Sequence, residues 1–577
     1  MLNFGVLLAV LAYVAVSARG DGREYGRPQC KAVPGSDLWP SDEAWAVLNA
    51  SIGGRLILPT PPGAVCHPEQ ASYNAVECST VQASWFSETL HTEDPISAIW
   101  NNWANDTCLP DPRLPCSSEG YPVYVINATA AQHVKAGIDF ARTHNIRLIV
   151  KNSGHDYVGR SSAPKSLSIW VHNMKGIERH ETGFQPRGCD ITISGSAITA
   201  AAGTQMLEAY RATALMNQTV VGGNGRTVAL GGYITGGGHS ILAPHYGMAA
   251  DQVLEVELVT PAGQIVTANE CQNTDLFWAM RGGGGSTFGV LTSITIKTVP
   301  SPEIMSLTFQ FATAANSPHA FDAITYFLGQ FPQLADAGVS GYPIIFKGQS
   351  FYTGVIGKVI MLNTRDESVI VSQFEPLFAY INATWPGFVF YTNATYYPSF
   401  GAWYEENYDP SPVGYGNVMG SRLLDGPALA ANATATKLAF EKFSDGGQAT
   451  VYIVSGKGVW HAQPRGGGTA ANPAWRRTYV HATASVSFAP LNSTAREAAT
   501  AQTNAFTAAL RELSPDTGAY INEADRYEPD WQYAFWGSNY PRLLEIKRTF
   551  DPDDVFWCTP CVGNERWQEV DDVLCRV

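Results

Sequence analysis

Four clusters of glycine carry the strongest chemical signal in the sequence. They stand beside short apolar runs, with hydroxyl side chains among them, at residues 222–225, 231–232, 236–238 and 282–285. Because glycine has no Cβ, backbone amides at such positions can approach an anion closely, and successive amides form a concave site for phosphate oxygens. A flexible linker would also be rich in glycine, but a linker is not embedded in apolar sequence such as Leu276–Met280. The clusters therefore predict a phosphate-binding cradle.

These clusters match neither of two common phosphate-binding motifs. The sequence contains no intact G-x-G-x-x-G pattern and no Walker lysine motif, which disfavours a nicotinamide-binding Rossmann fold and a P-loop. Nucleic acid is disfavoured too, because a net charge of −14 provides no basic surface for its phosphates. We expect a small-molecule ligand.

The elements that must position this cradle follow from local patterns. Residues 121–151 read as strand, helix, strand: an apolar run at 122–126, a capping box formed by Thr129 and Gln132, and a buried strand at 147–151. Residues 253–259 alternate Glu with apolar side chains, as a half-buried strand does, and pair with a return strand at 264–267. Further helices are predicted at 320–329 and 494–513, and further strands at 451–461 and 478–488.

The composition and the length of 577 residues indicate a folded protein with two or three domains. With 45% apolar and 15% charged residues the chain is unlike a disordered one, and it is too long for a single core. We expect a signal peptide at 1–18, a Cys-rich N-terminal extension at 19–120, a first domain at 121–300, an aromatic-rich second domain at 301–515, and a return to the first domain at 516–577.

The N-terminus predicts export. The apolar run Phe4–Val16 is shorter than the roughly 20 residues of a membrane-spanning helix, and small residues follow it, as at a signal-peptidase site. A buried N-terminal helix is the alternative. We therefore predict a secreted protein with no membrane segment after the signal peptide is removed.

Cysteines and glycosylation sequons agree with export. The ten cysteines are an even number, and the eight N-x-S/T sequons could carry N-glycans. The pair Cys558 and Cys561 could be a redox motif or half a zinc site, but no second C-x-x-C exists, which favours a structural disulfide and no metal. The sequons are at Asn49, Asn105, Asn127, Asn217, Asn382, Asn393, Asn432 and Asn492.

Five motifs in order along the chain resemble the berberine-bridge-enzyme-like FAD-linked oxidases of the vanillyl-alcohol oxidase superfamily, in their secreted fungal form. The resemblance covers nearly all of the mature chain. It implies an α+β fold, in which a split FAD-binding domain of two α/β subdomains joins a substrate domain whose antiparallel sheet is backed by helices. The motifs span residues 151–157, 230–238, 275–289, 520–525 and 535–552.

The same resemblance implies where FAD binds. The histidine of the family's G-H motif, which bonds covalently to the flavin 8α-methyl group, corresponds to His155. Read without the family, a histidine after a buried strand would be an ordinary hydrogen-bonded residue. Further cofactor contacts are implied at Lys151, Asn152, Ser153, Gly154, Asp156, Gly159, Ser161, Gly223, Gly225, Thr227, Val228, Gly231, Gly232, Thr235, Gly236, Gly237, Gly238, Val290, Tyr520, Asn522 and Asn539.

Two positions refine this picture. Many relatives attach flavin a second time through a cysteine, and ungapped alignment puts Gly225 at that position, so a single covalent link is expected. The residue three further on lies over the flavin in relatives, and small or β-branched choices there are associated with oxygen access. Val228 therefore favours an oxidase that reduces O2 to hydrogen peroxide over a dehydrogenase with another acceptor, although Val228 could also simply pack a strand.

The substrate side is less defined. Hydride transfer to flavin requires a base for the substrate proton. Relatives use a glutamate or tyrosine of the substrate sheet, or the tyrosine of the C-terminal motif, here Tyr520. The first predicted substrate strand has no glutamate, which leaves His461, Tyr479 and His481 as further candidates. The substrate could be an alcohol, a carbohydrate or a secondary metabolite, and we expect a monomer.

Aromatic residues of the second domain suit a sugar or an aromatic ring, although such residues are more often core. A secreted glycoside hydrolase or carbohydrate-binding protein could use them as well, and would need paired carboxylates in a cleft. They are Trp385, Phe388, Phe390, Tyr396, Tyr397, Trp403 and Tyr404.

Overall fold

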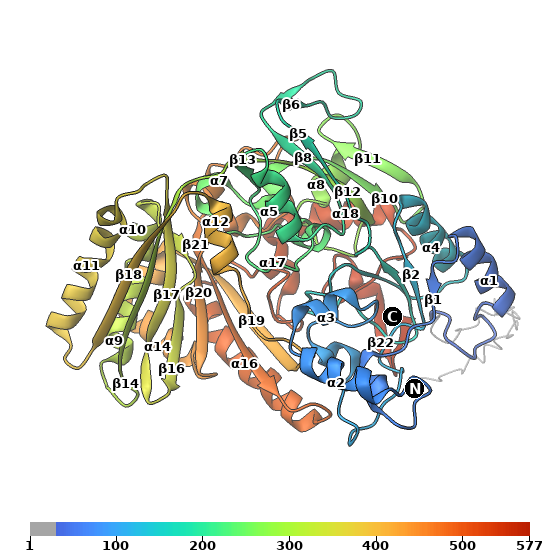
Figure 1. The fold of residues 1–577 in the computed structure, drawn as a ribbon, viewed down its shortest axis with the longest axis horizontal. Helices are drawn as coiled ribbons and strands as arrows, with labels where there is room; N and C mark the ends of the chain where they lie inside the picture. The colour runs from blue at the N-terminus through green and yellow to red at the C-terminus, as the bar shows by residue number, and fades with distance from the viewer. Residues whose placement is uncertain (1–29) are drawn as a thin grey trace, which may run out of the picture.

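The computed structural model describes residues 30–577, so the predicted signal peptide at 1–18 lies outside the described residues. Two lobes lie side by side (Figure 1). One lobe contains residues 30 to about 300 and the C-terminal end of the chain, and the other contains a large antiparallel sheet with its helices. Within residues 30–577, no helix combines the length and apolar character needed to cross a membrane.

The first subdomain is a four-stranded sheet whose β2, β3 and β4 run parallel. Helix α4 (Ala131–Thr143) covers it and buries Val134 and Ile138, as the helical spacing predicts. The capping box is wrong: α4 begins at Ala131 with no side-chain cap, so Thr129 lies outside the helix. The strands, in sheet order, are β1 (Leu56–Ile57), β2 (Tyr124–Asn127), β4 (Leu167–Trp170) and β3 (Leu148–Lys151).

The second subdomain is a five-stranded antiparallel sheet. Its predicted hairpin is confirmed, but Glu255 is buried, so the strand is not half-exposed. The carboxylate of Glu255 accepts hydrogen bonds from the Arg187 backbone and the Asn269 side chain, because a loop held by the disulfide Cys189–Cys271 covers that face. The strands, in order, are β11 (Ile265–Asn269), β10 (Val253–Val259), β12 (Val290–Lys297), β8 (Ala197–Ala201) and β5 (Ile177–His180).

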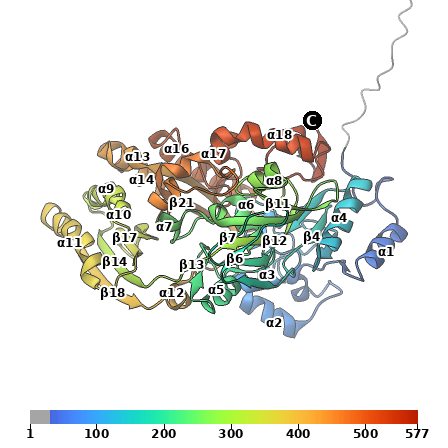
Figure 2. The ribbon, with the colours of Figure 1, turned by 90° about the horizontal axis from the view of Figure 1, so that it is seen from above.

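The second lobe is an eight-stranded antiparallel sheet with helices on its outer face, as Figure 2 shows for α9 and α11. Phe309 and Phe311 of the sheet pack against Phe327 of α9, and Phe309 also packs against Phe374 of α11. Its strands are β14 (Ile304–Ala314), β15 (Ser340–Gly341), β16 (Ile344–Gln349), β17 (Tyr352–Leu362), β18 (Val389–Tyr397), β19 (Gly416–Asp425), β20 (Gln448–Ile453) and β21 (Thr478–Phe488). Its helices include α9 (Ala320–Gly329), α11 (Glu367–Thr384), α14 (Ala433–Phe443) and α16 (Ser493–Leu513).

One predicted strand of this lobe is too long. The strand predicted at 451–461 ends at Ile453, and residues 457–460 form the short helix α15 (Lys457–Trp460). The chain turns at Gly456 and packs closely on α7 (Ala243–Tyr246): a Cβ at Gly458 would lie 2.4 Å from the carbonyl carbon of His245. The predictions for 320–329, 478–488 and 494–513 are confirmed, the last beginning one residue earlier.

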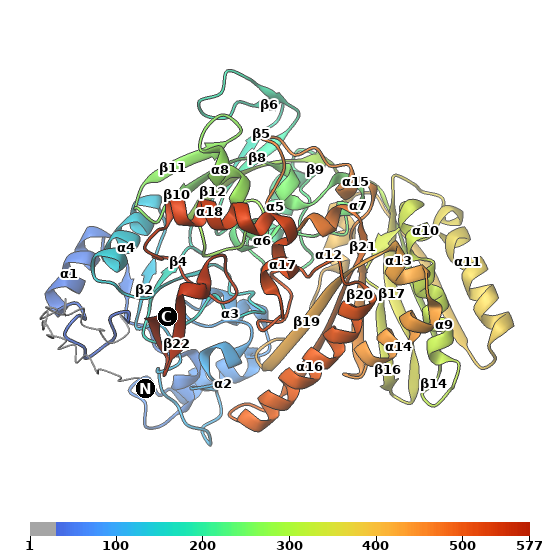
Figure 3. The same ribbon diagram turned by 180° about the vertical axis from the view of Figure 1, so that it is seen from behind.

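The C-terminal residues 516–577 lie against the first lobe, beside its N-terminal extension (Figure 3). Lys547 of α18 (Tyr540–Phe550) donates to the carbonyl of Thr287, and a disulfide joins Cys30 to Cys575. All ten cysteines are paired, so the C-x-x-C pair forms a disulfide as predicted. The remaining disulfides are Cys66–Cys78, Cys108–Cys116, Cys189–Cys271 and Cys558–Cys561.

Candidate functional site

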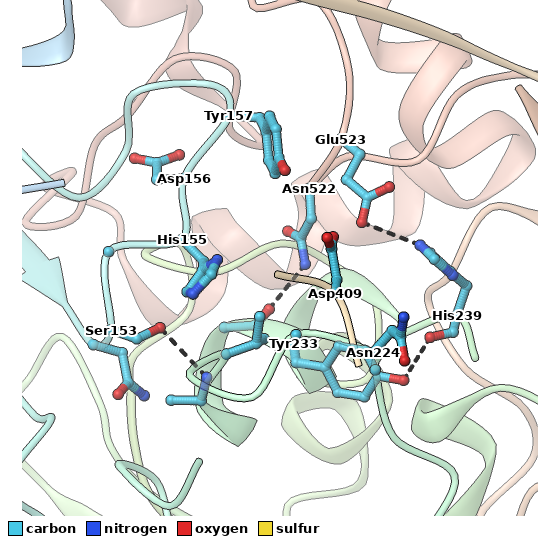
Figure 4. A pocket seen from close by; sticks show the side chains of 18 of the residues that line it. Ser153, His155, Asp156, Tyr157, Asn224, Tyr233, His239, Asp409, Asn522 and Glu523 are labelled. Carbon is cyan, nitrogen blue, oxygen red and sulfur yellow. Dashed lines mark hydrogen bonds and ion pairs between the residues drawn. The ribbon is translucent and has the colours of Figure 1, made fainter. Parts of the chain in front are cut away.

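A cavity of about 470 Å³ opens between the two lobes, with walls from both. Figure 4 shows His155 on one side of it and Glu523 with His239 on the other. Most residues that the sequence assigns to FAD line this cavity: Asn152, Ser153, Gly154, His155, Asp156, Ser161, Gly223, Gly225, Val228, Gly231, Gly232, Thr235, Val290, Tyr520 and Asn522.

The loop after β3 is folded around the carboxylate of Asp156. This carboxylate accepts hydrogen bonds from the backbone N–H groups of Val158, Arg160 and Ser161, the last at 2.6 Å. Gly154 has φ of +80°, a left-handed conformation that favours glycine, and a Cβ there would meet Ser97 O at 3.0 Å. The residue order Gly-His-Asp therefore fixes the loop locally and places His155 in the cavity wall.

The imidazole of His155 is held by a hydrogen-bonded chain. Its Nε2 lies 2.7 Å from the Thr227 hydroxyl, and that hydroxyl donates to a carboxylate oxygen of Glu88 at 2.8 Å. Burial lowers the pKa of His155 to about 3, so the ring is neutral. Sequence reasoning placed Thr227 here but missed Glu88, which belongs to the N-terminal extension and has no motif around it.

The glycine clusters leave space where a ligand can approach the backbone. A Cβ added to Gly232 would meet nothing within 4 Å, and one added to Gly225 would lie 3.0 Å from Val228 and 4.0 Å from His155 Cε1. Two buried polar atoms of this wall, Asn152 Oδ1 and Arg160 Nη1, have no hydrogen-bond partner in the described chain. An open glycine cradle with unpartnered polar atoms beside it fits FAD, a polar phosphorylated cofactor.

The opposite wall comes from one face of the substrate sheet. Along β20, Ala449 and Val451 pack in the helix-side core, whereas Thr450 and Tyr452 line the cavity. Lys358 of β17 lines it as well. The period-2 alternation of strands thus gives this sheet an apolar face for the helices and a polar face for the site.

A carboxylate between two histidines dominates this wall. His239 Nε2 lies 3.1 Å from one oxygen of Glu523, and His481 Nε2 lies 3.0 Å from the other. Burial alone would raise the pKa of Glu523, but the two histidines hold it below its usual range. Sequence reasoning missed Glu523 as a functional residue, although it is part of the motif at 520–525.

This cluster also has the composition of a metal site, but its hydrogen bonding argues against one. A metal-binding histidine almost always donates its second N–H to an acceptor. Nδ1 of His239 and Nδ1 of His481 are buried with no partner among the described residues. If each Nε2 carries the hydrogen and donates it to Glu523, each Nδ1 is left only as an unpaired acceptor. The prediction of no metal ligand therefore stands as a prediction.

Tyr520 lies in the same wall. Asn522 donates from Nδ2 to the Tyr520 hydroxyl at 3.0 Å and to the carbonyl of Gly232 at 3.1 Å, which ties the C-terminal motif to the glycine cluster. Burial raises the pKa of Tyr520 well above its ordinary value, so its hydroxyl stays protonated. Tyr520 can therefore donate a hydrogen bond to a ligand in the cavity.

Three other candidate bases do not line the cavity. His461 follows α15, where the chain has already left the sheet, and Tyr479 packs its ring 4.6 Å from that of Trp460. Neither lines the cavity: α15 takes the place of the predicted strand at His461, and Tyr479, on the confirmed strand β21, packs against Trp460 of that helix. His481 is buried behind Glu523 and contacts it directly.

Seven of the residues assigned to FAD are absent from the cavity wall. Lys151 is buried beneath the loop, where its amine donates to the carbonyls of His91 and Asp94, and Asn539 donates to the carbonyl of Ala471. Each polar group is thus already used within the protein. The full set is Lys151, Gly159, Thr227, Gly236, Gly237, Gly238 and Asn539.

Among the seven residues outside the cavity wall, the glycines allow neighbouring side chains to pack closely against the backbone. A Cβ at Gly236 would lie 2.1 Å from Asn522 Nδ2, and one at Gly159 would lie 2.6 Å from the ring of Trp103. Thr227 stands one contact behind the wall, hydrogen-bonded to His155. Among the seven aromatic residues singled out from the sequence, Trp403 lines the cavity, whereas Phe388 packs in the helix-side core.

Comparison with known proteins decides the family. Residues 122–269 match the family described as "FAD binding domain", and residues 519–562 match "Berberine and berberine like". An uncharacterized FAD-linked oxidoreductase of Arthroderma benhamiae is 36% identical over the full length of both chains. The chain belongs to this family of FAD-linked oxidoreductases. A Thermothelomyces thermophilus protein named VAO-type flavoprotein oxidase VAO615 is 32% identical, with 95% of this chain and 96% of that protein covered.

Solved structures agree with this assignment. The VAO-type flavoprotein MtVAO713 from Myceliophthora thermophila superimposes with a TM-score of 0.87 at 29% identity, with 96% of this chain and all of that chain covered. The α+β fold with a split FAD domain is thereby confirmed, and an FAD-linked oxidoreductase takes the place of the glycoside hydrolase and of the non-catalytic carbohydrate-binding protein. FAD is the cofactor that this family's domain binds.

Proposed function

We propose that this protein is a secreted oxidase that carries FAD covalently on His155 and transfers a hydride from a small organic substrate to it, with O2 reduced to hydrogen peroxide. The observation that carries the proposal is the state of His155. The ring lines the cavity, is neutral, and uses Nε2 for Thr227, which leaves Nδ1 without a partner in the described chain. A neutral ring nitrogen with a free lone pair is the nucleophile that covalent attachment needs.

The chain's own residues would hold FAD along the glycine side of the cavity. Asn152, Arg160 and the backbone around Gly232 supply polar contacts, and Gly225 beside His155 provides no sulfur for a second bond. When bound, FAD accepts the hydride and passes the electrons to an acceptor. A single covalent link through His155 is therefore the proposed state.

The substrate wall is built to handle a proton. Glu523 is anionic, and two of its lone-pair sites accept from His239 and His481, which leaves others for a substrate hydroxyl or amine. Tyr520, held neutral by burial, can orient the same group as a donor. Glu523 rather than Tyr520 therefore takes up the substrate proton in this proposal. An alcohol, a hemiacetal or a ring amine would suit it.

Dioxygen as acceptor rests on Val228, which lines the cavity next to Gly225. The valine side chain leaves more space for O2 in the cavity beside Gly225 than leucine or an aromatic ring would. The oxidase named among the relatives supports the same assignment. A dehydrogenase with a different electron acceptor is the alternative, and it predicts reduced flavin that persists in air.

Secretion with N-glycans is part of the proposal, supported by five disulfides in the described chain, which persist in oxidising compartments. Asn49 and Asn127 use their side-chain oxygens within the protein, as acceptors from Leu56 and Asn173. Both asparagines are also only partly exposed, whereas the six others are exposed and are better glycan acceptors. The six are Asn105, Asn217, Asn382, Asn393, Asn432 and Asn492.

The decisive experiment is the absorbance spectrum of the secreted protein before and after acid precipitation. Attached flavin keeps the pellet yellow, and mass mapping places it on the peptide with His155 and on no cysteine peptide. Flavin released wholly into the supernatant contradicts attachment. Reduced protein mixed with air should reoxidise within seconds and produce peroxide, whereas survival for minutes supports the dehydrogenase.

A further inference from the structure

The chain Glu88–Thr227–His155 has a defined direction. When Glu88 is ionised its carboxylate can only accept, so the single hydrogen of the Thr227 hydroxyl then points to Glu88, at 2.8 Å. The hydroxyl oxygen is then an acceptor toward His155, and Nε2, 2.7 Å away, must carry the ring hydrogen. Nδ1 is left with the lone pair. Glu88 thus selects the tautomer of His155 without touching Nδ1.

Glu88 is held in place for this contact. It begins the short helix α3 (Glu88–Glu93), which Ser87 caps, and its side chain is 17% exposed. His91 of the same helix bonds through its two ring nitrogens to Ser97 and to the carbonyl of Trp85. The buried amine of Lys151 donates to the carbonyl of His91, which ties α3 to the end of β3. The extension is therefore fixed against the loop that carries His155.

The environment of Glu88 suits a group that exchanges a proton. Burial, opposed by the hydrogen bond from Thr227 and reinforced by the charge of Asp409, raises the pKa of Glu88 to about 7. His155 Nε2 lies 3.9 Å from the same carboxylate oxygen that accepts from Thr227. A carboxylate with a pKa raised in this way is ionised above neutral pH, and it holds a proton more readily than an ordinary carboxylate does.

We propose that Glu88, acting through Thr227, sets His155 for flavin attachment and takes up the proton that leaves Nε2 when Nδ1 bonds to the flavin 8α carbon. This inference rests on the covalent attachment proposed above. Glu88 is a positioning residue, because it acts on the flavin through His155.

The Nδ1–C8α bond forms, and one C–H bond of the 8α-methyl group and the Nε2–H bond break. Both hydrogens leave as protons, and the C–H electron pair reduces the isoalloxazine ring. Dioxygen then takes up two electrons and two protons and becomes hydrogen peroxide. The proton from Nε2 passes to the Thr227 oxygen while the Thr227 hydrogen passes to Glu88.

The test follows attached flavin rather than turnover. Glu88→Gln keeps the shape of the side chain but cannot take up a proton, and Thr227→Val breaks the chain at its middle. The rate at which acid-stable flavin accumulates after synthesis should fall by about 10²-fold in both, the lower end of what proton transfer by a positioned group contributes. Total flavin, released plus retained, should match the wild type.

Two controls keep the test specific. Glu93→Gln changes an exposed glutamate of the same helix, and Thr227→Ser retains the hydroxyl, so both should attach flavin at the wild-type rate. If Glu88→Gln binds no flavin at all, the Thr227→Val variant is the test. Flavin attachment at the wild-type rate in Thr227→Val overturns the proposed proton transfer from His155 through Thr227 to Glu88. Wild-type attachment in Glu88→Gln overturns it directly. A wild-type protein without attached flavin instead overturns the covalent link itself.

Discussion

The two walls of the cavity are built in different ways. The flavin wall comes mostly from two stretches, 152–161 and 223–235, and the first of them is folded by local hydrogen bonds to Asp156. The substrate wall collects Lys358, Tyr452 and Glu523 from strands and a C-terminal loop far apart in sequence. A wall built from neighbouring residues appears in the sequence as a contiguous motif, whereas a wall that the sheet assembles from distant residues has no such motif. The sequence therefore shows the cofactor more clearly than the substrate.

The largest effect is expected from a change in the flavin wall, at His155. His155→Ala removes the ring nitrogen that binds the 8α carbon, so acid-stable flavin should be lost completely. FAD should remain bound without the covalent bond or be lost, and substrate oxidation should slow because the flavin potential falls. Acid precipitation and peptide mass mapping check this. Acid-stable flavin in the variant would place the attachment on another residue.

The next largest effect is expected from a change in the substrate wall, at Glu523, which should leave the flavin attached. Glu523→Gln removes the proton acceptor and should slow anaerobic flavin reduction by about 10²–10⁴-fold. Tyr520→Phe removes a donor and leaves the ring, so its effect on the same step should be smaller. Stopped-flow measurement with any substrate that reduces the wild type ranks the two. A larger loss in Tyr520→Phe would make Tyr520 the base, as the motif alone suggests.

Both variants should leave reoxidation by O2 unchanged, because neither residue lies beside Val228 in the flavin wall. A metal analysis of the wild type is the matching control. A stoichiometric divalent ion that is lost in Glu523→Gln would show that the His239–Glu523–His481 cluster binds metal, contrary to the hydrogen bonding described above.

A smaller effect separates the two half-reactions within the flavin wall. Val228→Leu or Val228→Ile adds bulk over the space next to Gly225, so reoxidation by O2 should slow several-fold. Anaerobic reduction by substrate should barely change. Rapid mixing of reduced protein with air-saturated buffer measures the first rate. Unchanged reoxidation in both variants would mean that oxygen reaches the flavin by another path.

The smallest change adds a bond rather than removing one. A Cβ at Gly225 would lie 4.0 Å from His155 Cε1, so the side chain of Gly225→Cys points toward the ring that carries the flavin. Mass mapping should then find flavin on the Gly225→Cys peptide as well as on the His155 peptide. Attachment through His155 alone would show that the sulfur does not reach the flavin.

The sequence alone determined several of the elements and the cofactor side of the site. The predicted bounds of α9, α16 and β21 agree with the structure almost to the residue, because helix and strand formation in these segments depends on neighbouring residues. The motif around His155 identified the flavin wall, because Gly154 and Asp156 fix that loop within a few residues.

Tertiary structure decided what depends on distant contacts. The burial of Glu255, the end of β20 before Gly456 and the position of Glu88 each follow from a segment that packs over them from far along the chain. Such contacts leave no periodicity, since the partner is set by the fold and not by spacing. For the same reason Glu523 becomes a functional candidate only when the sheet and α6 (Leu230–Gly236) bring His481 and His239 to its two oxygens.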